Sequence, residues 1–315
     1  MTTPPTRRSL LNRIFRSPED NRLRSGWRIF FQLVLLLLIS TFIGGIFILL
    51  FVRSTSITGE TGLIFNIVVN FLGILLSVYL ARRWFDHRSL LDLGLHGSPE
   101  MFKDLGFGIL LSGILMGIIF IIEWGAGWLK FNGFAWQSYP SGQVLLSVLG
   151  MFLGFIVVGF QEELLSRGYH LQNLAEGLNL FWGVLISSAI FAFLHLSNPN
   201  VSWAAMIGLI SAGIFLAYAY VRTRKLWLSI GLHIGWNFFE GTVFGFQVSG
   251  LTGIPRLIFQ TVNGPGLITG QAFGPEAGLI VLPVILLGLF AIYLYTRNRN
   301  SSTSKGTSKD QFPIS

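Results

Sequence analysis

Long apolar runs separated by short polar stretches form the dominant pattern of this chain. Each run is close to the ~20 residues that an α-helix needs to cross the hydrocarbon layer of a bilayer. The pattern therefore predicts an all-α, polytopic membrane protein with about eight transmembrane helices. In chain order, the predicted spans cover residues 29–52, 63–81, 105–122, 144 through the carboxylates at 162 and 163, 180–196, 201–221, 226–246 and 277–295.

The composition agrees with this pattern. Hydrophobic residues make up 52% of the chain and charged residues only 11%, and the mean hydropathy is +0.64. Soluble domains carry about 25% charged residues, so the composition indicates an integral membrane protein. There is no cysteine among the 315 residues, which excludes disulfides, thiol nucleophiles and cysteine-ligated metals.

The net charge of +8 comes from basic residues that sit between the apolar runs. If the N-terminus is cytoplasmic, only Arg53, Lys130 and Arg256 fall on the other side of the membrane. This asymmetry follows the positive-inside rule. We therefore expect a multi-pass protein of the plasma membrane with both termini in the cytoplasm. Membrane topology accounts for the positive charge, so we expect no nucleic-acid partner.

The order of polar and apolar stretches also predicts the organisation of the chain. Its last residues are rich in Ser, Thr, Asn and Lys, which is typical of a disordered tail. The predicted parts are a basic cytoplasmic segment (1–28), transmembrane helices 1–3 (29–142), a catalytic core of helices 4–7 (143–246), an extracytoplasmic loop (247–276), helix 8 (277–295) and a disordered cytoplasmic tail (296–315).

A charged cluster interrupts the fourth apolar run, where Glu162 and Glu163 are followed by Arg167. Ionisable residues at membrane depth are costly and mark functional sites by default. In a helix, Glu163 and Arg167 lie four positions apart on one face, with the Glu first, which favours an ion pair. Glu162 points about 100° away from Glu163 and is left available. One carboxylate is therefore expected to be structural and its neighbour chemical.

Two later apolar runs carry further polar side chains, namely His195 and the pair His233 and Asn237, which lie four residues apart on one helix face. If the fourth helix continues past the Glu pair to a turn at 177–179, Glu162 and His195 are equally distant from that turn. In an antiparallel helical hairpin such residues lie at the same height. The spacing therefore predicts that Glu162 and His195 face each other at one membrane depth.

A carboxylate and an imidazole that converge on one water form a general base. A second histidine and an asparagine amide can donate hydrogen bonds to a tetrahedral oxyanion. The set Glu162, His195, His233 and Asn237 therefore indicates hydrolysis of an amide by activated water. A zinc ion held by Glu162, His195 and His233 is the alternative, because the same residues form a three-ligand set with an open fourth position. No H-E-x-x-H motif accompanies either histidine.

In order along the chain, the motifs E-E-x-x-x-R, F-x-x-x-H and H-x-x-x-N resemble those of the CPBP family. This family comprises the CAAX prenyl proteases of the second type and bacteriocin-processing or bacteriocin-immunity proteins. The resemblance covers about residues 155–240 and implies an eight-helix intramembrane protease. It also implies the roles of six residues: Glu162 and His195 activate the water, His233 and Asn237 form the oxyanion site, and Glu163 and Arg167 orient the first motif.

The expected function is thus that of an intramembrane endopeptidase. Its expected partners are the lipid bilayer and a hydrophobic or lipidated peptide substrate, with no cofactor other than the zinc alternative. A second hypothesis is a non-catalytic membrane scaffold that binds peptides, or a bacteriocin immunity protein of the same fold. The two hypotheses differ in whether Glu162 is needed.

Overall fold

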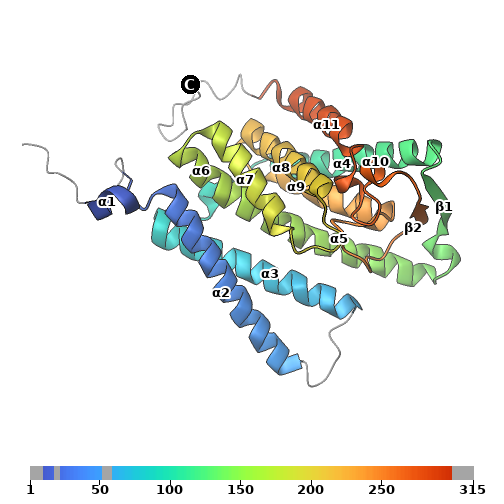
Figure 1. Cartoon of the computed structure of the whole chain (residues 1–315), viewed down its shortest axis with the longest axis horizontal. Helices are drawn as coiled ribbons and strands as arrows, with labels where there is room; N and C mark the ends of the chain where they lie inside the picture. The colour runs from blue at the N-terminus through green and yellow to red at the C-terminus, as the bar shows by residue number, and fades with distance from the viewer. Residues whose placement is uncertain (1–9, 18–21, 52–58, 300–315) are drawn as a thin grey trace, which may run out of the picture.

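The computed structural model describes residues 10–17, 22–51 and 59–299 and is built almost entirely from helices (Figure 1). The predicted disordered tail and the first part of the basic N-terminal segment lie largely outside these residues. The α-helices are α1 (Leu10–Phe15), α2 (Ser25–Phe51), α3 (Gly59–Ala81), α4 (Met101–Gly125), α5 (Ser141–Glu163), α6 (Gln172–Gly177), α7 (Leu180–Leu194), α8 (Trp203–Thr223), α9 (Trp227–Asn237), α10 (Gly266–Thr269) and α11 (Val281–Thr296).

Six shorter helical turns complete the described secondary structure besides two strands. Three of them have the wider π-helical geometry: η1 (Arg82–Asp86), η4 (Leu164–Leu171) and η5 (Phe238–Val243). The other three are 3₁₀ turns: η2 (Leu91–Leu93), η3 (Ala135–Gln137) and η6 (Pro275–Ala277).

The prediction of a helical, multi-pass membrane protein is confirmed. In the described residues, five helical stretches are long and apolar enough to cross a membrane: Ser25–Leu50, Gly62–Asp86, Met101–Gly125, Ser141–Gly177 and Trp203–Thr223. The helices α7 and α11 are apolar but shorter. The last predicted span corresponds to α9 followed by η5, in which almost every side chain is buried inside the protein.

Helix α9 is the central helix, because glycines let α4 approach it closely. A Cβ added to Gly108 of α4 would lie 2.5 Å from the backbone nitrogen of Leu232. A Cβ on Gly231 of α9 would lie 2.5 Å from the carbonyl oxygen of Leu105. Only residues without a side chain permit such backbone contact, as in other membrane helix pairs. The position of α9, and so of His233 and Asn237, depends on these glycines.

Two hydrophobic clusters cover different faces of α9. Leu232 and Trp236 belong to a cluster that also contains side chains of α4, α8 and α11. Ile230 and Ile234 belong to a second cluster with Leu164 and further residues of η4, α3 and α8. Residues four positions apart lie on the same face of a helix, so each of these two pairs belongs to one cluster. This arrangement fixes the rotation of α9 about its axis.

The fourth predicted helix continues well past the Glu pair, as the sequence predicts. The elements α5, η4 and α6 form one helical stretch of 37 residues, Ser141–Gly177. The chain then turns and α7 begins at Leu180, where the side chain of Asn179 accepts a hydrogen bond from the backbone nitrogen of Trp182 (3.0 Å). An asparagine at this position caps a helix N-terminus. The expected turn at 177–179 is therefore confirmed.

A two-stranded antiparallel sheet was not predicted. Strand β1 (Leu129–Phe134) pairs with β2 (Ile258–Val262), with Leu129 opposite Val262 and Phe134 opposite Ile258. The second strand and α10 both lie within the segment 247–276, which was expected to be a plain loop. The two strands are short and far apart in sequence, so neither has a periodicity long enough to be recognised.

Buried ion pairs hold the hairpin of α2 and α3 (blue in Figure 1) to the rest of the chain. Asp86 of η1 lies 3.1 Å from a guanidinium nitrogen of Arg28 and 3.0 Å from one of Arg82. Arg28 also pairs with Glu176 of α6 at 3.1 Å. These arginines belong to the basic stretches that the sequence assigned to the cytoplasmic side. They also have a structural role, because they join α2, η1 and α6.

Candidate active site

The first motif lies where α5 widens into the π-helical turn η4. Glu162 and Glu163 are the last residues of α5, and Leu164 begins η4. The side chain of Glu162 is 24% exposed, whereas that of Glu163 is fully buried. π-Helical segments occur frequently at functional sites, because the wider turn changes the direction of the side chains. The predicted division of the two carboxylates into one buried and one accessible group agrees with this geometry.

Glu163 joins two of the three motifs. Its Oε1 accepts hydrogen bonds from Nη1 of Arg167 (2.9 Å) and from Nδ1 of His233 (2.8 Å). The predicted pairing of Glu163 with Arg167 is therefore present. Arg167 also donates from Nη2 to the carbonyl oxygen of Gly213 in α8 (2.9 Å). The bond to His233, which connects the end of α5 to α9, does not follow from the sequence pattern.

The ring of Phe191 in α7 lies at the centre of the charged residues. The guanidinium carbon of Arg167 lies 4.6 Å from the centroid of this ring, which is the geometry of a cation–π interaction. The imidazoles of His195 and His233 lie with their ring centroids 4.8 and 6.0 Å from that of Phe191. The phenylalanine of the second motif therefore packs against the guanidinium of Arg167 and the imidazoles of His195 and His233.

Hydrogen bonding determines which nitrogen of each histidine is available. His195 follows the last residue of α7, and its Nδ1 lies 2.8 Å from the carbonyl oxygen of Phe191. A carbonyl oxygen only accepts, so Nδ1 of His195 carries the proton and donates. Nδ1 of His233 donates in the same way to the carboxylate of Glu163. In both rings Nε2 is the nitrogen left for chemistry.

Both free nitrogens face Glu162. Oε2 of Glu162 lies 3.9 Å from Nε2 of His195 and 3.7 Å from Nε2 of His233. The prediction that Glu162 and His195 lie at one depth thus agrees with their positions. Separations above 3.5 Å are too long for direct hydrogen bonds and suit a water molecule that contacts both groups. The arrangement can therefore hold a water between a carboxylate and an imidazole.

Asn237 lies one turn after His233 in α9 and is 7% exposed. It lines a cavity of about 20 Å³ together with His233, Trp236, Phe191 and Glu276 of η6. The η5 turn follows Asn237 directly, so a second π-helical segment borders the third motif. Asn237 therefore shares a cavity with His233, which in turn lies close to Glu162.

The zinc alternative depends on the distances between the donor atoms of Glu162, His195 and His233. Ligands about 2.1 Å from a tetrahedral ion lie about 3.4 Å from one another. The two separations from Oε2 of Glu162, 3.9 and 3.7 Å, are only slightly longer. The described part of the chain holds no preformed group of three or more His, Asp or Glu side chains that could bind a metal ion, so zinc held by Glu162, His195 and His233 stays a prediction.

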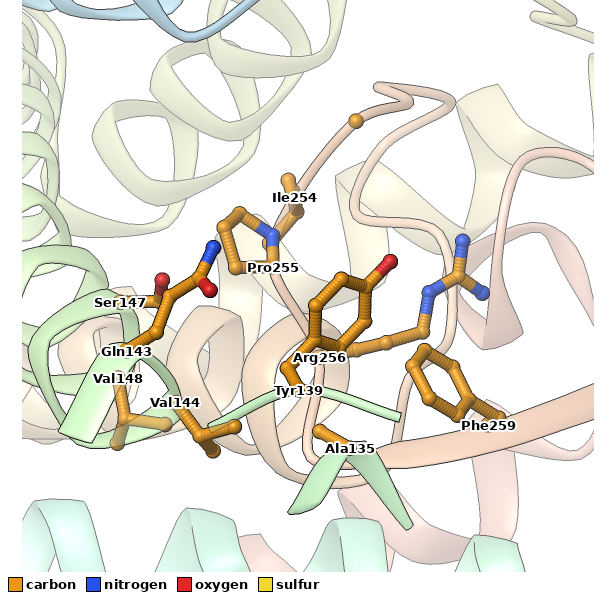
Figure 2. Close-up of a pocket in the computed structure, with 11 residues that line it drawn as sticks. Ala135, Tyr139, Gln143, Val144, Ser147, Val148, Ile254, Pro255, Arg256 and Phe259 are labelled. Carbon is orange, nitrogen blue, oxygen red and sulfur yellow. The ribbon is translucent and has the colours of Figure 1, made fainter. Parts of the chain in front are cut away.

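A different cavity lies near the start of α5 (Figure 2). Its volume is about 290 Å³, and Tyr139, Gln143, Ser147 and Arg256 line it with several apolar side chains. Ser147 lies 15 residues before Glu162 on the same helix, which corresponds to a rise of about 22 Å. The residues that line this cavity include the cationic Arg256 but no Asp, Glu or His. The chemistry described above is therefore not located there.

The comparison with known proteins agrees with the geometry. Residues 143–239 match the family model of the Rce1-like type II CAAX prenyl endopeptidases. The predicted family resemblance is confirmed. This Rce1-like segment extends from α5 to the start of η5 and contains all six motif residues. Glu276 and its hydrogen-bond partner Ser249 lie beyond it.

A bacterial protein matches a similar length of chain. A stretch of 104 residues is 30% identical to the protein named "Putative membrane peptidase YdiL" of Bacillus subtilis (strain 168). The match covers 33% of this chain and 37% of that relative. The similarity thus spans little more than a third of the relative's length, and the Rce1-like segment is also about a third of this chain.

Proposed function

We propose that the protein is an intramembrane endopeptidase that hydrolyses a peptide bond of a membrane-associated or lipidated peptide with a water activated by Glu162 and His195. The observation that carries the proposal is the position of Oε2 of Glu162, which lies 3.9 Å from Nε2 of His195 and 3.7 Å from Nε2 of His233. Similarity over a third of the chain to the protein named "Putative membrane peptidase YdiL" supports this assignment.

In the first step the carboxylate of Glu162 accepts a proton from the water while the water oxygen attacks the carbonyl carbon of the substrate. Nε2 of His195 accepts the second hydrogen bond of the water, because its Nδ1 proton is already donated to Phe191. Holding the water between two acceptors directs its remaining lone pairs toward the substrate. The step forms the C–O bond and leaves the negative charge on the former carbonyl oxygen.

The oxyanion then needs hydrogen-bond donors, and α9 supplies two of them. Asn237 can donate from its carboxamide. Because Glu163 accepts from Nδ1 of His233, this ring can donate from Nε2 only when both nitrogens are protonated. The carboxylate of Glu163 and the oxyanion itself balance that positive charge, because Glu162 has by then taken a proton from the water. Donors fixed in place before the reaction stabilise the developing charge without reorganisation.

Collapse of the intermediate completes the proton balance. The C–N bond breaks as Glu162 returns its proton to the leaving nitrogen, and the products are an amine and a carboxylic acid. The new acid passes its proton through His195 to the amine, so the products leave as a carboxylate and an ammonium and His195 is neutral again. Glu163, Arg167 and Phe191 touch no reacting atom in this scheme and instead hold the two histidines in position.

The location of the site indicates the class of substrate. Glu162 lies within a long apolar helical stretch, and many large hydrophobic side chains are exposed on the outer surfaces of α2, α4 and α5. A peptide must bring its scissile bond to this depth, and burying a polar backbone there without partners is costly. A hydrophobic or lipidated segment offsets that cost, since each buried CH₂ contributes about 0.8 kcal/mol.

The test is peptide cleavage by the purified protein in liposomes. We expect wild-type protein to cleave at least one member of a panel of quenched hydrophobic and lipidated peptides, and Glu162→Ala to lose cleavage. Glu100→Gln, at an exposed position, serves as the matched control and should cleave normally. Each reaction is run with and without a metal chelator, and loss of cleavage in the chelator would contradict the metal-free scheme. Equal background for wild type and Glu162→Ala across the panel, with both folded, would instead favour a peptide-binding scaffold.

A further inference from the structure

Glu276 is an acidic residue at the site that lies outside the three motifs. It belongs to η6, just before α11, and is only 5% exposed. It lines the same cavity of about 20 Å³ as His233, Trp236 and Asn237. A segment far along the chain from the Rce1-like segment therefore reaches the third motif.

Several contacts hold Glu276 in this place. Oγ of Ser249 donates a hydrogen bond to its Oε2 (2.5 Å), and Ser249 has a left-handed backbone conformation with φ of 48°. Such strained conformations cluster at functional sites. The carbonyl oxygen of Ser249 accepts from Nδ2 of Asn198 (2.9 Å), three residues after His195. The loop carrying Ser249 thus joins the end of the second motif to Glu276.

A glycine in α8 allows the backbone of η6 to approach. A Cβ on Gly208 would overlap the carbonyl oxygen of Glu276, so only glycine fits at this position. Glu276 is therefore fixed through both its backbone and its side chain. A carboxyl group that merely fills space between helices does not need such constraints.

Trp236, which lines this cavity, carries an unpaired hydrogen-bond donor. Nε1 of Trp236 is buried and makes no hydrogen bond within the part of the chain that the structure describes. Buried donors without partners are rare and indicate a bound water or ligand. A cavity of at least 10–15 Å³ accommodates one water molecule, so this cavity is large enough. A water there can accept from Trp236 and Asn237 and donate to the carboxylate of Glu276.

We propose that Glu276 is a positioning residue that orients the carboxamide of Asn237 through a water enclosed in this cavity. In this orientation the NH₂ group of Asn237 is available to the substrate. An asparagine amide can rotate by 180° and present its oxygen instead, which would repel an oxyanion. An acceptor behind the NH₂ group prevents this rotation by binding one N–H and leaving the other free. The inference rests on the proposed function, because it assigns the second N–H to the substrate oxygen.

A double-mutant cycle in the liposome cleavage assay tests this inference. We expect Glu276→Gln to lower kcat about tenfold with little change in KM, because its amide no longer provides only acceptors. In the Asn237→Ala background, which has no amide to orient, the same substitution should have no further effect. Glu276→Asp, which keeps the carboxylate, should recover part of the loss. If Glu276→Gln lowers kcat equally in both backgrounds, the inference is wrong.

Thermal unfolding of the same four proteins in detergent gives a readout that does not depend on cleavage. We expect the changes in unfolding temperature caused by Glu276→Gln and Asn237→Ala to be non-additive, because the two side chains share one water. Strict additivity would contradict the inference even if wild-type protein cleaves the peptides. If no peptide is cleaved while the unfolding cycle shows coupling, the proposed function fails and the structural link between Glu276 and Asn237 is retained.

Discussion

Glu163 and His233 are hydrogen-bonded although they lie 70 positions apart in the chain, with Oε1 of Glu163 2.8 Å from Nδ1 of His233. The same oxygen also accepts from Arg167 at 2.9 Å. One buried carboxylate oxygen therefore orients the third motif and neutralises the arginine of the first. Its neighbour Glu162 remains accessible. Adjacent residues of one helix thus have separate tasks, which leads to the first prediction.

Glu163→Ala should lower the stability of the protein, whereas Glu162→Ala should abolish cleavage and leave the stability nearly unchanged. Removing Glu163 leaves Arg167 buried without a counter-charge, which costs about 3–5 kcal/mol of the free energy of unfolding. Removing Glu162, which is 24% exposed, should change that free energy by less than about 1 kcal/mol while abolishing cleavage. Unfolding in detergent and cleavage in liposomes measure the two effects. A stable Glu163→Ala protein would refute the structural role of this carboxylate.

His195→Ala should reduce cleavage by about a hundredfold to ten-thousandfold and leave the unfolding temperature nearly unchanged. The reason is that His195 is partly exposed and its Nδ1 bond is to the backbone of its own helix. The matched control is His96→Ala, because His96 is 60% exposed and pairs only with Asp92. Retention of wild-type kcat by His195→Ala would remove this residue from the mechanism.

The contact between α4 and α9 predicts a contrast between two glycines of α4. Gly108→Ala should destabilise the protein by about 1–3 kcal/mol, since its Cβ would lie 2.5 Å from the backbone nitrogen of Leu232. Gly106→Ala should be neutral or stabilise the protein by about 0.5–1 kcal/mol, because nothing lies within 4 Å of its Cβ position and alanine favours helix. Thermal unfolding distinguishes them. Equal effects would mean that α4 and α9 are not in backbone contact.

Asp86→Asn should loosen the contact between α2 and the end of α3 at η1. The substitution removes the charge that Arg28 and Arg82 share, and a broken buried pair costs about 3–5 kcal/mol. The control is Arg88→Gln, because Arg88 is 47% exposed and its pair with Glu176 contributes at most about 1 kcal/mol. Limited proteolysis in detergent reports on the hairpin. Unchanged protection in Asp86→Asn would contradict this role of the ion pairs.

The class of fold followed from the sequence alone, because apolar runs of this length satisfy their backbone hydrogen bonds in a bilayer as helices. The ion pair of Glu163 and Arg167 also followed from the sequence, since helix periodicity places residues four apart together. The continuation of α5 through η4 and α6 to a turn was predictable too, as no proline interrupts this stretch. These are all properties of residues close together in the chain.

How the helices meet depends on the tertiary structure. Periodicity does not show that Glu163 bonds to His233, that Arg167 lies over the ring of Phe191, or that β1 pairs with β2. It also does not show that Glu276 and Ser249 reach the site from outside the Rce1-like segment. Each of these contacts joins residues that are distant in sequence. They form because glycines and apolar side chains set the depth and rotation of each helix, and packing, unlike periodicity, depends on every neighbour at once.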